Sequence, residues 1–184
     1  LSHVEIELSG SEVPLLDGSA LGWVEAIAEA GLTPAATERL PQPVLREPMV
    51  RCRGASVITA TPAERFSLVG IIDFPQAAIG RQQFALELTP QRFVDEIAPA
   101  RTFGFRDQVE QLRAAGLIQG GALDNGLVCD GDQWMKPPLR FADEPVRHKL
   151  LDLIGDLALV GFPQAQVLVY RGSHGLHTDL AAAL

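Results

Sequence analysis

The sequence predicts an α+β fold, and two observations lead to that prediction. Candidate strands and helices follow one another in pairs, with hairpins in place of a regular strand–helix–strand alternation. Such an order is typical of α+β domains and not of doubly wound sheets. The 184 residues are 47% hydrophobic and 21% charged, an ordinary globular composition with enough apolar material for a core.

Composition also excludes several functions. The net charge of −8 and the lack of a Lys/Arg cluster argue against nucleic-acid binding. The sequence contains no apolar run of membrane-spanning length, so no transmembrane segment is expected. Neither Cys52 nor Cys129 belongs to a CxxC motif, which argues against a zinc knuckle and fits a reducing cytoplasm.

The first third of the chain predicts a strand, a helix and a linker. Residues 3–8 alternate between apolar and polar side chains, as a half-buried strand does. Apolar residues recur at helical spacing over residues 20–30, and Gly31 ends this helix. Residues 33–48 contain four prolines and are interpreted as a linker and candidate domain boundary.

The middle of the chain predicts mainly strands. Residues 49–60 and 66–74 are rich in Val, Ile and Thr and are expected to pair as an antiparallel hairpin. A third strand is expected at 82–88, after which Thr89 and Pro90 begin a helix as N-cap and first-turn residue.

The last third continues with shorter elements. We expect a helix at 107–115, strands at 127–129 and 165–170, an irregular edge strand at 133–141, and a final helix at about 176–184.

One helix, predicted over residues 143–161, organises the rest. Asp143 can cap it, Pro145 occupies its first turn, and Gly161 ends it. Its side chains are apolar nearly all round, which is typical of a buried helix.

The polar face of that helix carries His148, Asp152 and Asp156 at i, i+4 and i+8. Buried carboxylates beside an imidazole must be paired or bound to a metal. Spacing alone leaves both outcomes open, and a self-paired polar stripe is the commoner one. A catalytic zinc needs three protein ligands, so the rest of the chain would have to contribute. His174, in a glycine-flanked turn at 171–175, is one side chain that could face a cleft.

Five segments occur in the order of a single known family. They are residues 14–20, 100–105, 116–121, 139–144 and 147–157. Together they resemble UDP-3-O-acyl-N-acetylglucosamine deacetylase, the zinc enzyme of lipid A synthesis, and the resemblance runs along the whole chain. It implies two α+β domains packed as a sandwich, with the helices between the sheets. Residues 1–36 would be the C-terminal part of a first domain that is largely missing, and 37–184 the second domain.

The resemblance also implies site residues. His148 and Asp152 would be two of three ligands of a zinc that activates water for attack on the N-acetyl group. His174 would stabilise the oxyanion and protonate the leaving amine, and Asp156 would hold its imidazole. Thr102 would hydrogen-bond the tetrahedral intermediate.

The same resemblance implies the substrate contacts. Lys149 would lie near the nucleotide-sugar diphosphate. Phe103 and the apolar side of helix 107–115, with Leu117 and Ile118, would border the acyl-chain passage. The expected partner is UDP-3-O-acyl-N-acetylglucosamine, and a monomer is expected.

The sequence departs from the family pattern at several positions. The first zinc ligand and the general-base glutamate belong to a Glu-His-x-x-x-Ala-Leu segment that would precede Leu1, so we expect an N-terminally truncated chain that binds zinc weakly and turns over little substrate. His177 replaces the usual Asn, and Gly172-Ser173 inverts the usual Ser-Gly order.

Three alternatives stay open. The metal could be iron, because a His/Asp pair does not distinguish the two ions. The chain could be a non-catalytic remnant or an acyl-sugar-binding module of the same fold. Without the resemblance, it could be a soluble α+β domain whose helix has a polar stripe.

Overall fold

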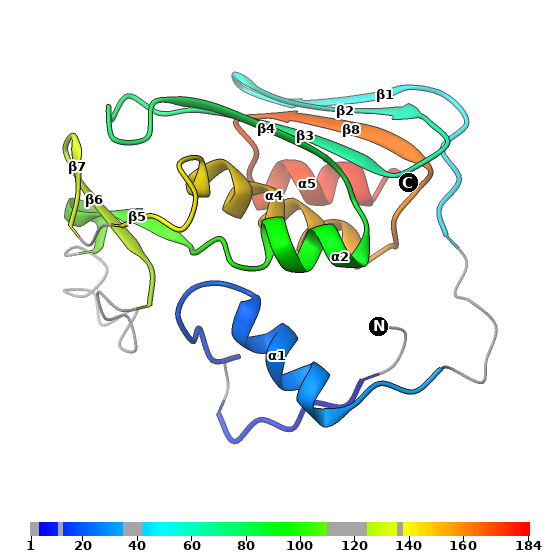
Figure 1. Ribbon diagram of the computed structural model, residues 1–184. Helices are drawn as coiled ribbons and strands as arrows, with labels where there is room; N and C mark the ends of the chain where they lie inside the picture. The colour runs from blue at the N-terminus through cyan, green and yellow to red at the C-terminus, as the bar shows by residue number, and fades with distance from the viewer. Residues whose placement is uncertain (1–3, 11–12, 35–41, 110–124, 136–137) are drawn as a thin grey trace.

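A computed structural model describes residues 4–10, 13–34, 42–109, 125–135 and 138–184. Its centre is a five-stranded sheet in the order β1-β2-β8-β3-β4, with helices α4 and α5 side by side on one face (Figure 1). A three-stranded sheet, β5-β6-β7, lies at one end of the molecule. The predicted α+β class is confirmed.

The first hairpin of the sheet corrects one sequence prediction. The single strand predicted at 49–60 is instead two strands, β1 (Met49–Arg53) and β2 (Ser56–Pro62), which pair antiparallel. The turn between them contains Gly54 at φ 57°, a left-handed conformation that glycine adopts without steric cost.

The predicted pairing of 49–60 with 66–74 was wrong. β3 (Ser67–Asp73) instead forms a hairpin with β4 (Arg81–Glu87). The late strand β8 (Ala165–Tyr170) lies between the two hairpins, antiparallel to β2 and parallel to β3. Along β3 and β8, alternate residues are buried, so one face of the sheet packs against the helices.

The helices cover that face. α4 (Glu144–Ala158) packs against β3, β4 and α5 (His174–Ala181), and α5 packs against β1 and β2. α2 (Pro90–Arg92) continues into the π-helical segment η1 (Phe93–Ile97), which contacts α4. Thr89 caps α2 as predicted, its hydroxyl accepting from the Arg92 N–H at 3.2 Å. The core between the layers includes Ile58, Leu68, Leu150, Leu153, Leu157, Val167, Leu176 and Leu180.

The ends of α4 differ partly from prediction. Asp143 occupies the N-cap position but its side chain makes no capping bond, because its carboxylate pairs with the Arg147 side chain at 2.7 Å. At the other end, α4 stops at Ala158, before the predicted end at Gly161, whose N–H bonds to the Leu157 carbonyl at 3.0 Å.

The second sheet contains β5 (Phe103–Phe105), β6 (Leu127–Asp130) and β7 (Gln133–Trp134). Of the described residues of the predicted strand at 133–141, the first two are in a strand. Of the predicted helix at 107–115, the described part, 107–109, is helical. Residues 110–115, Leu117 and Ile118 lie outside the described residues.

The N-terminal segment packs little. α1 (Leu21–Ala30) is the predicted helix, and none of its residues is buried. The predicted strand at 3–8 was wrong over its described residues, 4–8, which form no regular structure. The predicted domain boundary at 36/37 lies outside the described residues. In the parts of the chain that the structure describes, no helix has both the length and the apolarity needed to cross a membrane.

Candidate functional site

His148 is buried on α4 and its two ring nitrogens have different surroundings. Its Nδ1 lies 3.0 Å from the Ala100 carbonyl oxygen, and a carbonyl only accepts, so Nδ1 carries the proton. The lone pair of Nε2 is therefore available, and Nε2 lies 3.6 Å from Oδ1 of Asp152. Burial lowers the pKa of His148, which favours the neutral ring that metals bind.

Asp152 is held from its other side. Its Oδ2 accepts a hydrogen bond from the Lys149 Nζ at 2.7 Å, which leaves Oδ1 facing His148. The Lys149 ammonium also lies 5.6 Å from the centre of the Phe103 ring. That ring in turn meets the His148 imidazole edge-on, with 6.5 Å between ring centres. His148, Lys149, Asp152 and Phe103 thus form one cluster.

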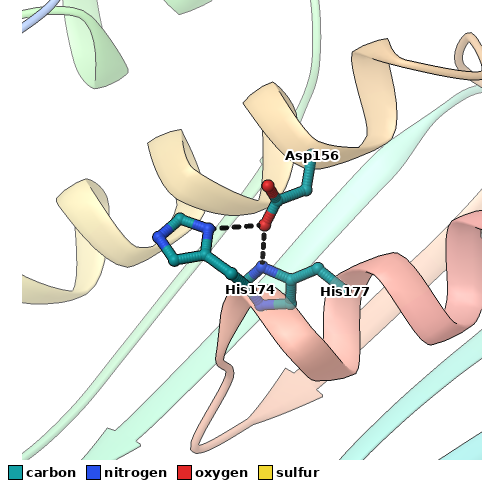
Figure 2. A group of neighbouring side chains, drawn as sticks. All are labelled: Asp156, His174 and His177. Atoms are coloured by element: carbon teal, nitrogen blue, oxygen red, sulfur yellow. Dashed lines mark hydrogen bonds and ion pairs between the residues drawn. The ribbon is translucent and has the colours of Figure 1, made fainter. Parts of the chain in front are cut away.

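Asp156, one turn further along α4, belongs to a second cluster. Its Oδ2 lies 2.8 Å from Nδ1 of His174 and 2.8 Å from Nδ1 of His177, both on α5 (Figure 2). His174 is largely exposed, with 69% of its side chain accessible, whereas His177 is 1% accessible. One carboxylate oxygen therefore joins an exposed imidazole to a buried one.

The two clusters differ in how well they could hold a metal ion. Within the described residues, Asp156, His174 and His177 are the group of three potential ligands whose ligand atoms lie within 4.8 Å of one another. Ligand atoms that share a tetrahedral zinc lie about 3.4 Å apart, because each bond is about 2.0–2.2 Å long. The separations of 2.8 Å around Asp156 are those of hydrogen bonds. The 3.6 Å between His148 and Asp152 is close to the separation that a shared ion requires.

A buried ion pair supports the first cluster. Glu144, which is fully buried, accepts from the Arg101 side chain at 2.8 and 3.1 Å and from the backbone N–H groups of Arg101 and Arg140 at 3.0 and 2.6 Å. Burial by itself raises the pKa of Glu144, but these hydrogen bonds and the Arg101 charge outweigh it and lower the pKa. The pair fixes the backbone next to Ala100, whose carbonyl orients His148.

Thr102 lies two residues beyond that carbonyl. Its N–H donates to the Gly18 carbonyl at 2.6 Å and its carbonyl accepts from the Leu127 N–H at 2.7 Å. These backbone bonds tie it between the N-terminal segment and β6. Its predicted role toward an intermediate stays a prediction.

The comparison with known families uses the whole chain. The sequence profile of the UDP-3-O-acyl N-acetylglycosamine deacetylase family matches residues 1–184. The chain belongs to this family. Among relatives of this deacetylase family, UDP-3-O-acyl-N-acetylglucosamine deacetylase of Thermosynechococcus vestitus is 52% identical over 185 residues, which cover 100% of this chain and 64% of the relative.

Two other relatives give the same result. The protein of the same name from Synechocystis sp. is 50% identical over 183 residues, 98% of this chain and 66% of its own length. An Arabidopsis thaliana protein, probable UDP-3-O-acyl-N-acetylglucosamine deacetylase 1, mitochondrial, is 44% identical over 202 residues. These cover 99% of this chain and 62% of the relative. The chain thus spans somewhat less than two thirds of the length of these deacetylase-family relatives.

Sequence reasoning placed six site residues in these two clusters and missed the groups that hold them. His177 was treated only as a departure from the family pattern, although a second imidazole three residues after His174 on a helix could have suggested a shared partner. Glu144 was treated only as part of a motif. The Ala100 carbonyl has no signal in the sequence, because every residue has a carbonyl.

Proposed function

We propose that this protein is a metal-dependent deacetylase that removes the N-acetyl group from UDP-3-O-acyl-N-acetylglucosamine, giving the free amine and acetate in lipid A biosynthesis. The names of its relatives support the substrate. The observation that carries the chemistry is the free Nε2 of His148, 3.6 Å from Asp152 Oδ1, on a ring whose Nδ1–H is bonded to Ala100.

His148 and Asp152 would hold the metal, either zinc or iron. Such an ion, when bound, polarises the amide carbonyl and lowers the pKa of a nearby water. Catalytic zinc takes three protein ligands, and His148 and Asp152 would be two of them. The hydrogen bonds from Ala100 and Lys149 would orient the two ligands, as such outer contacts do in metal sites.

The second cluster would transfer the proton to the leaving amine. The Nδ1 of His174 is bonded to Asp156, so its Nε2 is the nitrogen that can face substrate. Asp156 would hold this ring in place, and His174 in its protonated form would stabilise the oxyanion and then protonate the leaving amine. Thr102 would donate a hydrogen bond to the tetrahedral intermediate.

The remaining residues would bind the substrate. We assign Phe103 to the border of the acyl-chain passage, where its ring packs with Phe74 and Phe105. Lys149 would contribute positive charge toward the diphosphate while bonded to Asp152. We also propose the domain division at 36/37, which agrees with the absence of buried residues in α1.

Metal analysis of the full-length protein tests this function. We expect one zinc or iron per chain and release of acetate from UDP-3-O-acyl-N-acetylglucosamine. His148→Ala and Asp152→Ala are expected to abolish both. Asp179→Ala, which removes an acidic side chain paired with Arg53 on the exposed side of α5, is the matched control and should abolish neither.

Two outcomes would contradict the proposal. One is a metal content that neither His148→Ala nor Asp152→Ala changes. The other is loss of metal in His177→Ala with retention in His148→Ala, which would move the ion to the Asp156 cluster.

A further inference from the structure

His177 is a buried imidazole that the proposed reaction does not use. Its Nδ1 lies 2.8 Å from Asp156 Oδ2, the same oxygen that lies 2.8 Å from His174 Nδ1. A carboxylate oxygen only accepts, so the Nδ1 of His177 carries its proton. Two N–H donors from one helix therefore converge on a single oxygen of α4 (Figure 2).

The other ring nitrogen shows that His177 remains neutral. Its Nε2 is buried and, among the described residues, has no hydrogen-bond partner. Protonation of Nε2 would give a positively charged ring whose second N–H is buried without an acceptor. This costs far more than a buried lone pair without a donor. Burial accordingly lowers the pKa of His177, although Asp156 acts in the opposite direction.

The groups that surround His177 give it a different role from that of His174. Asp156 and, further away, Asp152 face it from α4, and His174 faces it from α5. From β1, the Arg53 guanidinium lies against Gly175 and is paired with Asp179. His177 is thus a neutral donor inside the layer, and His174 is the imidazole that solvent and substrate can reach.

Gly172 supplies the space that the His177 ring occupies. A Cβ at this position would lie 2.5 Å from His177 Nε2 and 2.9 Å from a Val169 methyl group, both closer than real Cβ contacts. The backbone of Gly172 is not left-handed, so the requirement is for space. The following residue, Ser173, caps α5 by accepting from the Leu176 N–H at 3.4 Å. Gly172 therefore leaves the space for the His177 ring, and Ser173 caps the helix that carries it.

We propose that His177 is a positioning residue, seated by Gly172, whose Nδ1–H fixes the Asp156 carboxylate and through the shared oxygen aims His174 at the substrate. This inference rests on the proposed function of His174. A carboxylate held by one exposed donor alone can rotate about its side-chain torsions. The second, buried donor removes that freedom before substrate arrives, which is the preorganisation that catalysis requires.

Two substitutions at one position test the proposal in the full-length protein. His177→Asn places an amide N–H close to the original Nδ1, and His177→Leu fills the space with no donor. We expect kcat to fall about tenfold in His177→Leu, with KM unchanged, since one hydrogen bond to a charged group is lost. His177→Asn should stay within about twofold of wild type. Equal loss in both variants, or no loss in His177→Leu, would overturn the proposal.

A spectroscopic measurement separates this inference from the proposed function. In ¹⁵N-labelled protein, imidazole nitrogen shifts identify the tautomer of each ring. We expect His177 to be a neutral Nδ1–H tautomer at pH 7, because its pKa is lowered from the ordinary His value of about 6.5. An Nε2–H or doubly protonated His177 would overturn the positioning role. Inactivity of the wild type with this signature present would count against the proposed function alone.

Gly172→Ala gives an independent test through a double-mutant cycle. In wild type the added methyl group must displace His177, so we expect kcat to fall by a similar factor of about ten. Combined with His177→Leu, the same substitution should cost much less, because the oriented donor is already gone. Strictly multiplicative losses would overturn the coupling of the two residues.

Discussion

The two clusters beside α4 both combine imidazole and carboxylate groups but are arranged for different chemistry. At His148, Nδ1 bonds to a backbone carbonyl and the lone pair of Nε2 faces a carboxylate 3.6 Å away. At Asp156, one carboxylate oxygen accepts hydrogen bonds from the Nδ1 atoms of two imidazoles, each at 2.8 Å. The surroundings of both ring nitrogens therefore set what each imidazole can do.

Asp156→Asn is expected to have the largest effect, and it should affect the Asp156 cluster without affecting the His148 cluster. The amide keeps the shape but loses the carboxylate that holds the His174 ring, so we expect kcat to fall about 10³-fold, within the range for general acid catalysis. Metal content, measured on the same purified protein, should be unchanged. Simultaneous loss of metal would mean that the two clusters form one site.

Glu144→Gln tests the scaffold of the His148 cluster. The substitution leaves the Arg101 charge without its buried partner, and we expect the free energy of unfolding to fall by about 3 kcal/mol in denaturant titration. Glu87→Gln is the matched control, since its pair with Arg65 is on the surface and should contribute less than about 1 kcal/mol. Similar effects of the two substitutions would contradict the buried-pair argument.

Lys149→Met tests whether Lys149 acts on the metal site through Asp152 or on the substrate. The methionine keeps an unbranched apolar side chain but removes the ammonium group and its bond to Asp152. We expect metal affinity to fall about tenfold, as for other contacts that orient ligands. A rise in KM at unchanged metal affinity would show instead that Lys149 acts only on the substrate.

The smallest expected effect is on the pH dependence of stability. The pKa of His177 is lowered in the folded protein, so its contribution is complete above the unfolded value of about 6.5 and is lost as pH falls from there through the folded pKa. His177→Asn cannot be protonated. Between pH 7 and 5 its unfolding free energy should therefore decrease less steeply than that of wild type. An equal slope would mean that folding leaves the pKa of His177 unchanged.

Local patterns predicted local structure and little else. The periodicity of 143–161 located α4, and the spacing of its polar residues located both clusters. The sheet order was not predictable from such patterns, because β8 pairs with β2 and β3 across about a hundred residues of intervening chain, and no local pattern encodes that pairing. The residues that orient the clusters, Ala100 through its carbonyl and Glu144 through its burial, depend on the same long-range packing.

The position of β8 between the two hairpins also affects the order of events during synthesis. β1-β2 and β3-β4 can each form from neighbouring residues, but their inner edges stay open until residues 165–170 leave the ribosome. His174 follows β8 by four residues, so the strand that closes the sheet also delivers the second cluster to α4. A nascent chain that stops before β8 exposes two strand edges and a carboxylate without either of its imidazoles.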